Sequence, residues 1–144
     1  MQQLAQYNFE NYIRNTIFHA AREAIENHQQ QEIPVVLLSG STRVMVTPIA
    51  QAMGFNDIAC TELELIDGTY TGGIVGPFCI RDGKLNRGQD YCQQHNMNFG
   101  NAMYYGNSIS DIRIFEKIGY PVAVNTNPKL KEIGDQNHWR IEYW

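Results

Sequence analysis

The chain has 144 residues, a length that suits one domain able to bury a core. Its residues are 43% hydrophobic and 18% charged, which is typical of a globular protein and excludes a disordered chain. The net charge of −4 gives no electrostatic reason to expect nucleic acid or an anionic membrane as a partner. A small phosphorylated ligand is still compatible with it, because local lysines and arginines can bind one.

The cysteines and the first residues of the chain indicate in which cellular compartment the protein is expected. Cys60, Cys79 and Cys92 are three in number and widely spaced, which predicts neither a disulfide framework nor a metal site. Met1 is followed by polar residues rather than by the basic and apolar regions of a signal peptide. No apolar run approaches the ~20 residues that span a bilayer. We therefore expect a cytoplasmic protein without a membrane span.

A helix and then a buried strand are predicted at the start of the chain. Apolar residues recur at helical spacing over residues 4–28, and residues 33–38 form a continuous apolar run of strand length. The strand should end at Ser39-Gly40, before the N-terminus of the next helix, where a hydroxyl can bind an anion. Ser39 can equally be a simple turn residue, and from this turn alone that plainer role is favoured.

The next predicted elements are a helix, a hairpin and a second helix. The helix that follows Ser39-Gly40 should end at Gly54, and a short strand should follow at residues 58–60. Asp67-Gly68, flanked by apolar residues, is the strongest short-range sign of a β-hairpin. The second helix should begin near Lys84, where the helix dipole disfavours a cation, so Lys84 is a candidate anion ligand. An ordinary solvated lysine is the commoner case.

A polar loop between a predicted strand at residues 102–105 and a predicted helix at residues 112–118 is the second candidate site. Ligands of open parallel sheets bind beyond the carboxyl ends of the strands, so three residues should face a crevice there: Asn107, Ser108 and Asp111. The same residue types are preferred helix caps, and a role of Ser110 or Asp111 in capping alone is an equally good interpretation.

The end of the chain continues the alternation. Residues 120–124 predict a strand, Pro128 begins a helix, and residues 138–144 predict a last strand. Strands and helices in alternation predict an α/β fold with a mostly parallel sheet, right-handed crossovers and one inserted β-hairpin.

Several stretches together resemble the haloacid dehalogenase (HAD) superfamily, in particular its phosphoserine-phosphatase-like branch. They are Val-Val-Leu-Leu-Ser-Gly-Ser at 35–41, Thr-Glu-Leu-Glu at 61–64 with Asp-Gly-Thr-Tyr-Thr-Gly at 67–72, Gly83-Lys84, and Tyr-Gly-Asn-Ser-Ile-Ser-Asp at 105–111 followed by Pro-Val-Ala-Val-Asn at 121–125. The resemblance runs from about Phe9 to the C-terminus. It implies one domain, 1–144, in which residues 1–30 are a remnant of the helical cap or a linker helix and residues 33–144 form a Rossmann-like, three-layer core.

The resemblance also implies an activity. The family hydrolyses phosphomonoesters through an aspartyl-phosphate intermediate, with Mg²⁺ bridging the nucleophile and the phosphate. By resemblance, Ser39 and Gly40 bind phosphate and Lys84 pairs with the phosphate and a carboxylate. Asn107 and Asp111 lie near the metal, with Ser108 in support. Such groups suit the chemistry, because phosphoryl transfer spreads negative charge that a cation, hydroxyl donors and a metal must stabilise.

The sequence departs from the family pattern at two places. The Asp-x-Asp-x-Thr motif that carries the nucleophile does not occur in the 144 residues, and Asn107 stands where the family has a metal-ligating aspartate, which removes a charge from the metal site. The chain is similar to the family from inside its cap insert onward, so a front portion is expected to be missing. We therefore expect a fragment or degenerate phosphatase that is inactive alone. The alternatives are an enzyme completed by upstream sequence or a partner chain, and a non-catalytic phosphate-binding module.

The missing strand has an architectural consequence. In the family it lies between the strand of Leu37 and the strand of Tyr104, so its absence leaves two inner edges. Unpaired edges invite pairing with another chain. We expect one of two outcomes. Either these two strands pair directly, or the gap is filled in trans by a homo-oligomer or by strand exchange. The second outcome is favoured.

Overall fold

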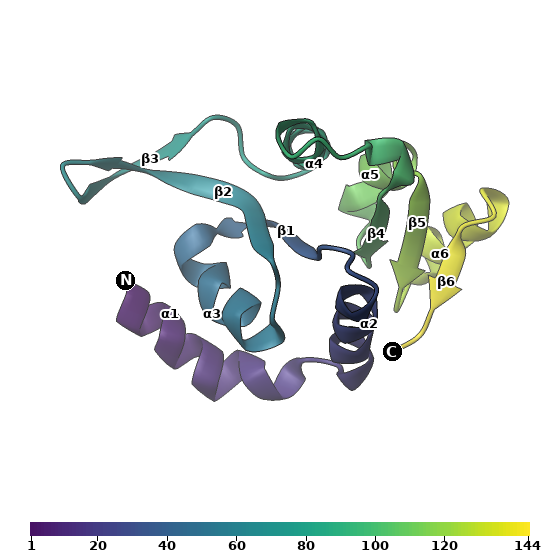
Figure 1. Ribbon diagram of the computed structural model, residues 1–144, viewed down its shortest axis with the longest axis horizontal. Helices are drawn as coiled ribbons and strands as arrows, with labels where there is room; N and C mark the ends of the chain where they lie inside the picture. Colours follow the sequence, from purple (N-terminus) through teal and green to yellow (C-terminus); the bar gives the residue numbers. More distant parts are fainter. The chain divides into compact units, whose positions relative to one another are not determined.

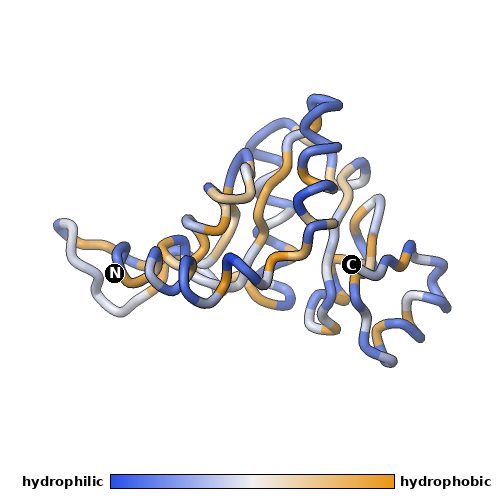
Figure 2. Tube along the Cα trace, turned by 90° about the horizontal axis from the view of Figure 1, so that it is seen from below, coloured by the Kyte–Doolittle hydropathy of each residue, from blue (hydrophilic) through white to orange (hydrophobic).

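The structure, a computed structural model, describes residues 1–144. The chain divides into two compact units, an N-terminal unit (Met1–Cys79) and a C-terminal unit (Ile80–Trp144). Along the chain, hydrophobic and hydrophilic residues alternate in short stretches (Figure 2). None of the helices combines the length and the apolar character that crossing a membrane requires.

The N-terminal unit is built around a three-stranded sheet. Its elements are α1 (Gln2–Asn8), the π-helical η1 (Phe9–Ile13), the 3₁₀-helical η2 (Arg14–Thr16), α2 (His19–Gln30), β1 (Val36–Thr42), α3 (Arg43–Met53), β2 (Asp57–Ile66) and β3 (Thr69–Val75). The strand order is β1-β2-β3, with β1 parallel and β3 antiparallel to β2. Helix α1 packs along α3, and β2 and β3 form a long hairpin (Figure 1).

The prediction of one helix over residues 4–28 is wrong. The helix ends after η2, and Ile17 and Phe18 have extended backbone before α2 begins. The Thr16 hydroxyl donates a 2.7 Å hydrogen bond to the Ile13 carbonyl. Such local side-chain bonds compete with continuation of a helix, so the apolar residues of this stretch are divided between two helices.

Other predictions for this unit are confirmed, although two of its strands are longer than predicted. Asp67 and Gly68 have φ values of 49° and 76°, as a two-residue hairpin turn with positive φ at both positions requires. Gly54 ends α3 in the left-handed conformation, as predicted. Both β1 and β2 are longer than predicted, and β1 continues through the residues expected to form the turn after Leu38.

The C-terminal unit contains a parallel sheet. Its elements are α4 (Asp82–Gln94), η3 (Phe99–Asn101), β4 (Met103–Gly106), η4 (Ile109–Asp111), α5 (Ile112–Phe115), β5 (Tyr120–Val124), α6 (Pro128–Gln136) and β6 (Arg140–Glu142). The strand order is β4-β5-β6, all parallel. Its core contains Phe115, Ala123 and Leu130, with Tyr104 and Trp139 packed against them.

Two boundaries in this unit differ from the predictions. Helix α5 ends at Phe115 instead of continuing to residue 118. Gly119, of the residue type that commonly caps a helix C-terminus, does not have a positive φ. A Cβ atom on Gly119 would overlap the backbone carbonyl of Gly100, so close backbone approach is the reason for glycine there. The last strand is restricted to Arg140–Glu142.

The fold is α/β, as predicted, and β3 is the predicted hairpin insertion. The strands form two three-stranded sheets, one mixed and one parallel, rather than a single sheet. β1 and β4, the strands of Leu37 and Tyr104, are each edge strands of their own sheet.

Candidate functional site

The segment around Ser39, where a turn was expected, is a bulge in the pairing of β1 with β2. Ser39 is opposite Cys60 and Thr42 is opposite Thr61, so two residues of β1, Gly40 and Ser41, have no counterpart on β2. Bulges of this kind re-aim side chains and are frequent beside active sites. The Ser39 Oγ accepts a hydrogen bond from the Ser41 N–H at 3.2 Å. Ser39 thus lies within β1 rather than in the predicted turn, with a local hydrogen bond of the kind that turn serines make. Its phosphate role remains a prediction.

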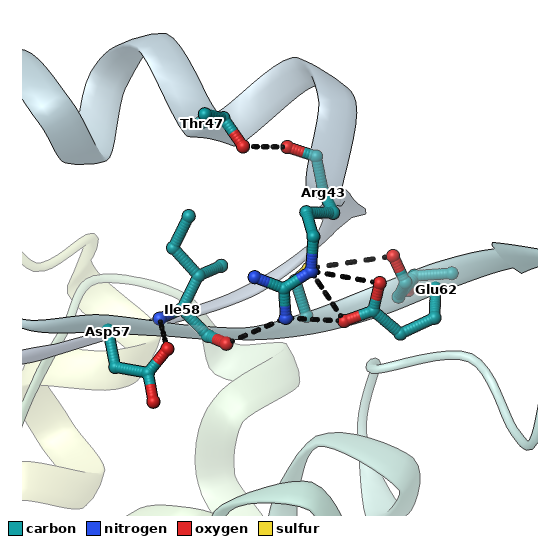
Figure 3. A network of polar contacts seen from close by, with 7 residues as sticks. Arg43, Thr47, Asp57, Ile58 and Glu62 are labelled. Carbon is teal, nitrogen blue, oxygen red and sulfur yellow. Dashed lines mark hydrogen bonds and ion pairs between the residues drawn. The ribbon is translucent and has the colours of Figure 1, made fainter.

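An ion pair fixes the start of α3 to β2, directly after this bulge (Figure 3). The Arg43 Nε donates to both carboxylate oxygens of Glu62, at 2.9 and 3.0 Å, and its Nη2 donates to the Ile58 carbonyl at 3.0 Å. Hydrogen bonding to Glu62 raises the pKa of the Arg43 guanidinium. Because the guanidinium already donates to both the Glu62 carboxylate and the Ile58 carbonyl, we assign it a structural role rather than one in anion binding.

Lys84, Asp111 and Tyr104 form a polar cluster in the C-terminal unit. The Lys84 Nζ donates to Asp111 Oδ1 at 3.0 Å, and the Tyr104 hydroxyl donates to Asp111 Oδ2 at 2.9 Å. The side chains of Lys84 and Asp111 are only 15% and 7% exposed. The Lys84 Nζ also lies 5.7 Å from the centre of the Tyr104 ring, within the range of a cation–π interaction.

This cluster decides between the local interpretations of two residues. Lys84 is not an ordinary solvated lysine, and the Asp111 side chain makes no capping hydrogen bond to α5. The capping role belongs instead to Ser108, whose Oγ accepts from the Ser110 N–H at 3.2 Å. Asn107 is exposed. Of the residues proposed from sequence, the structure thus brings Lys84 and Asp111 together, whereas Ser39 and Gly40 belong to the N-terminal unit.

The local sequence explains how Asp111 reaches this position. Tyr104 points its ring into the core of the unit, edge-on to Phe115 at 5.4 Å between ring centres. After β4 the chain turns through the Ser108 cap into η4, which ends at Asp111. The model of the haloacid dehalogenase-like hydrolase family matches residues 2–116, most of the chain, including this turn and the Ser39 bulge.

The chain belongs to the haloacid dehalogenase-like hydrolases. The phosphoserine phosphatase SerB2 of Mycobacterium tuberculosis is 30% identical over 115 residues, which cover 80% of this chain and 28% of that protein. The histidinol-phosphatase of Neisseria meningitidis serogroup C is 25% identical over 147 residues, covering 97% of this chain and 66% of that protein. The crystal structure of a protein of unknown function from Bordetella pertussis Tohama I has a TM-score of 0.89 and 26% identity, covering 96% of this chain and 63% of that one.

These matches establish the HAD-like fold and support the phosphoserine-phosphatase-like branch of the family. The chain spans between about a quarter and two thirds of the length of these relatives.

HAD-like hydrolases typically depend on Mg²⁺, which prefers anionic oxygen ligands. In the cluster of the C-terminal unit, Asp111 is the one carboxylate, and both of its oxygens already accept hydrogen bonds. Asn107 offers a neutral amide. No group of three or more His, Cys, Asp or Glu side chains in residues 1–144 is arranged to hold a metal ion. These residues therefore do not make a complete Mg²⁺ site by themselves.

The sequence pattern predicts no role for two polar residues of these sites. Tyr104 lies in a predicted strand, and its bond to Asp111 crosses a turn whose path the sequence does not reveal. Thr61 is fully buried, and its hydroxyl contacts the Ser39 bulge. A threonine inside an apolar strand is the signal that could have drawn attention to it, because a buried hydroxyl needs a partner.

Proposed function

We propose that this chain is the phosphate-binding part of a HAD-like phosphomonoester hydrolase. Ser39 and Gly40 are the phosphate-binding residues proposed in the N-terminal unit, and Lys84 is the phosphate-binding cation proposed in the C-terminal unit. The nucleophilic aspartate is supplied from outside residues 1–144, so this chain alone does not hydrolyse phosphomonoesters.

One observation carries the proposal, namely the Lys84–Asp111 pair. Taking a lysine ammonium largely out of water is costly, and a single carboxylate at 3.0 Å, also held by Tyr104, offsets that cost. A cation fixed in this way has lost its freedom before a ligand arrives. Such preorganised charge is what a phosphoryl group requires.

A titration with inorganic phosphate tests the binding half of the proposal. Amide resonances of the 144-residue chain should shift with phosphate, and the dissociation constant should rise about tenfold in Ser39→Ala and in Lys84→Ala, the loss expected for one hydrogen bond to a charged group. Ser110→Ala and Lys129→Ala remove an exposed serine and an exposed lysine and serve as matched controls. Equal affinity in all five proteins would contradict the proposal.

A hydrolysis assay tests the catalytic half. With p-nitrophenyl phosphate or phosphoserine and Mg²⁺, the 144-residue chain should release no more phosphate than Lys84→Ala does, because a covalent mechanism requires its nucleophile. Mg²⁺-dependent turnover that Lys84→Ala abolishes would show that the chain is active alone.

The source of the nucleophile can be found by sequencing. An in-frame Asp-x-Asp-x-Thr upstream of the Met1 codon would place it in a longer product of the same gene, and that product should be active. The absence of such a motif would favour a binding or structural role, or a nucleophile supplied by a partner chain.

A non-catalytic phosphate-binding module is the second candidate. It is favoured by Asn107, an amide at the position where the family resemblance implies a metal-binding carboxylate, because the loss of that charge weakens the attraction for Mg²⁺. For such a module, phosphate should bind equally well with and without Mg²⁺, and no longer gene product or partner should restore hydrolysis.

A further inference from the structure

Thr61 is fully buried next to the Ser39 bulge, and its hydroxyl makes two hydrogen bonds. It donates to the Gly40 carbonyl at 2.9 Å and accepts from the Cys79 N–H at 3.1 Å. A valine would fill the same volume without a polar group, and burying a hydroxyl is costly unless it is bonded. The hydroxyl therefore has a specific use at this position.

The two bonds are made to backbone groups of Gly40 and Cys79, which have no pairing partner in the sheet. Gly40 and Ser41 have no counterpart on β2, so their backbone direction is set by other contacts. Because the peptide unit is planar and trans, the Gly40 carbonyl and the Ser41 N–H point in opposite directions. When Thr61 holds that carbonyl, it also fixes the direction of the Ser41 N–H.

The Ser41 N–H donates to the Ser39 Oγ at 3.2 Å. The Ser39 oxygen is thereby used as an acceptor, while its own proton is left to donate elsewhere. A hydroxyl oriented in this way is suited to an anion such as a phosphate oxygen. The path from Thr61 to the Ser39 hydroxyl thus runs through one rigid peptide unit.

We propose that Thr61 is a positioning residue for the phosphate-binding hydroxyl of Ser39, acting through the Gly40–Ser41 peptide. This inference rests on the proposed phosphate role of Ser39. Thr61 itself is buried below the bulge and does not contact the ligand.

Three variants of the 144-residue chain separate this role from packing. Thr61→Val keeps the shape and removes the hydroxyl, and Thr61→Ser keeps the hydroxyl and removes the methyl group. The matched control is Thr47→Val, which removes a hydroxyl that also donates to a backbone carbonyl, that of Arg43, at 2.7 Å. Each is titrated with inorganic phosphate by NMR, and the hydrogen-exchange rate of the Ser41 amide is measured without phosphate.

In Thr61→Val we expect the phosphate dissociation constant and the Ser41 exchange rate each to rise about tenfold, the effect of losing one hydrogen bond of ordinary strength. Thr61→Ser and Thr47→Val should stay within about twofold of the parent. If Thr61→Val does not fold, Thr61→Cys, which has a similar size and a weak donor, is judged by the same criteria.

An unchanged Ser41 exchange rate in the folded hydroxyl-free variant would overturn the inference, as would loss of phosphate affinity in Thr61→Ser. If the parent chain does not bind phosphate, the proposed function fails, and the positioning role of Thr61 is then decided by the Ser41 exchange rate alone. The two failures are therefore distinguishable.

Discussion

At the scale of single residues, Asp111 shows how a nearly buried charge is stabilised. Burying an isolated charge is costly, because the charge loses its contact with water. Lys84 supplies the opposite charge to one oxygen, and Tyr104 supplies a hydrogen bond to the other. The cluster therefore depends on each of its three members.

Removing the Tyr104 hydroxyl should destabilise the C-terminal unit. In Tyr104→Phe the ring still packs against Phe115, but one oxygen of a buried carboxylate loses its donor, and we expect the free energy of unfolding to fall by about 1–3 kcal/mol. Both tryptophans of the chain lie in this unit, so urea unfolding followed by tryptophan fluorescence reports it specifically. Tyr120→Phe, which changes an exposed tyrosine of β5, should change the value by less than about 0.5 kcal/mol. Equal stability of the two variants would contradict the role of the hydroxyl.

Cys60 gives the N-terminal unit a pH dependence. Burial, followed by the negative charge of Glu62, raises the pKa of the Cys60 thiol from 9.0 to about 11. The folded state thus holds its proton more tightly than the unfolded state. The resulting stabilisation is fully present below pH 9 and is lost as the pH rises towards 11.

This dependence can be isolated with Cys60→Ala. The difference in free energy of unfolding between the parent and the variant, measured by far-UV circular dichroism in urea, should shrink between pH 9 and pH 11. All other ionisable groups are shared by both proteins, so their contributions cancel in the difference. A constant difference across this range would show that the thiol ionises equally in both states.

At the scale of elements, the local signals were reliable where one residue type imposes the backbone conformation. Asp67-Gly68 predicted the hairpin turn, Gly54 predicted the end of α3, and the apolar run at 120–124 matches β5 in full. These features depend on φ angles or on the burial of consecutive residues. Both can be deduced from neighbours in sequence.

The predictions failed where contacts between distant residues decide the structure. The break at Ile17–Phe18 divides a stripe that reads as continuous, and β1 extends past Leu38 because Thr61 and Glu62 of the adjacent strand contact the bulge and the start of α3. Lys84 and Asp111 are both site candidates from sequence, but their direct bond is not predicted, since the resemblance implies only that Lys84 pairs with a carboxylate. Nothing in the sequence pointed to the hydroxyl of Tyr104.

Gly119 gives an element-scale prediction. Its Cα lies so close to the Gly100 carbonyl that any Cβ would displace backbone, so Gly119→Ala should push η3 away from the start of β5 and destabilise the C-terminal unit by about 2 kcal/mol or more, as overpacking does. Gly100→Ala is the control, because its Cβ would meet the Asn98 side chain, which can move. Tryptophan fluorescence in urea compares the two. A smaller loss in Gly119→Ala than in Gly100→Ala would contradict the close approach.

At the scale of the whole molecule, the two sheets leave edges that can pair with other chains. β1 pairs with β2, and β4 pairs with β5, so each has one side without a strand partner in its own sheet. The N–H and C=O groups on such a side form a template for another strand. In the HAD family the nucleophile strand lies between the two strands that β1 and β4 resemble.

We therefore expect the 144-residue chain to self-associate through these edges. Light scattering should show a mass that rises with concentration, and hydrogen exchange of the β1 and β4 amides should slow as the concentration increases, because pairing protects their N–H groups. The amides of α6, which lie in a helix with its own hydrogen bonds, should exchange at a rate independent of concentration. A monodisperse monomer over a wide concentration range would refute association. Slowed exchange in β3 instead of β1 and β4 would place the contact at the hairpin, whose outer strand is also an edge.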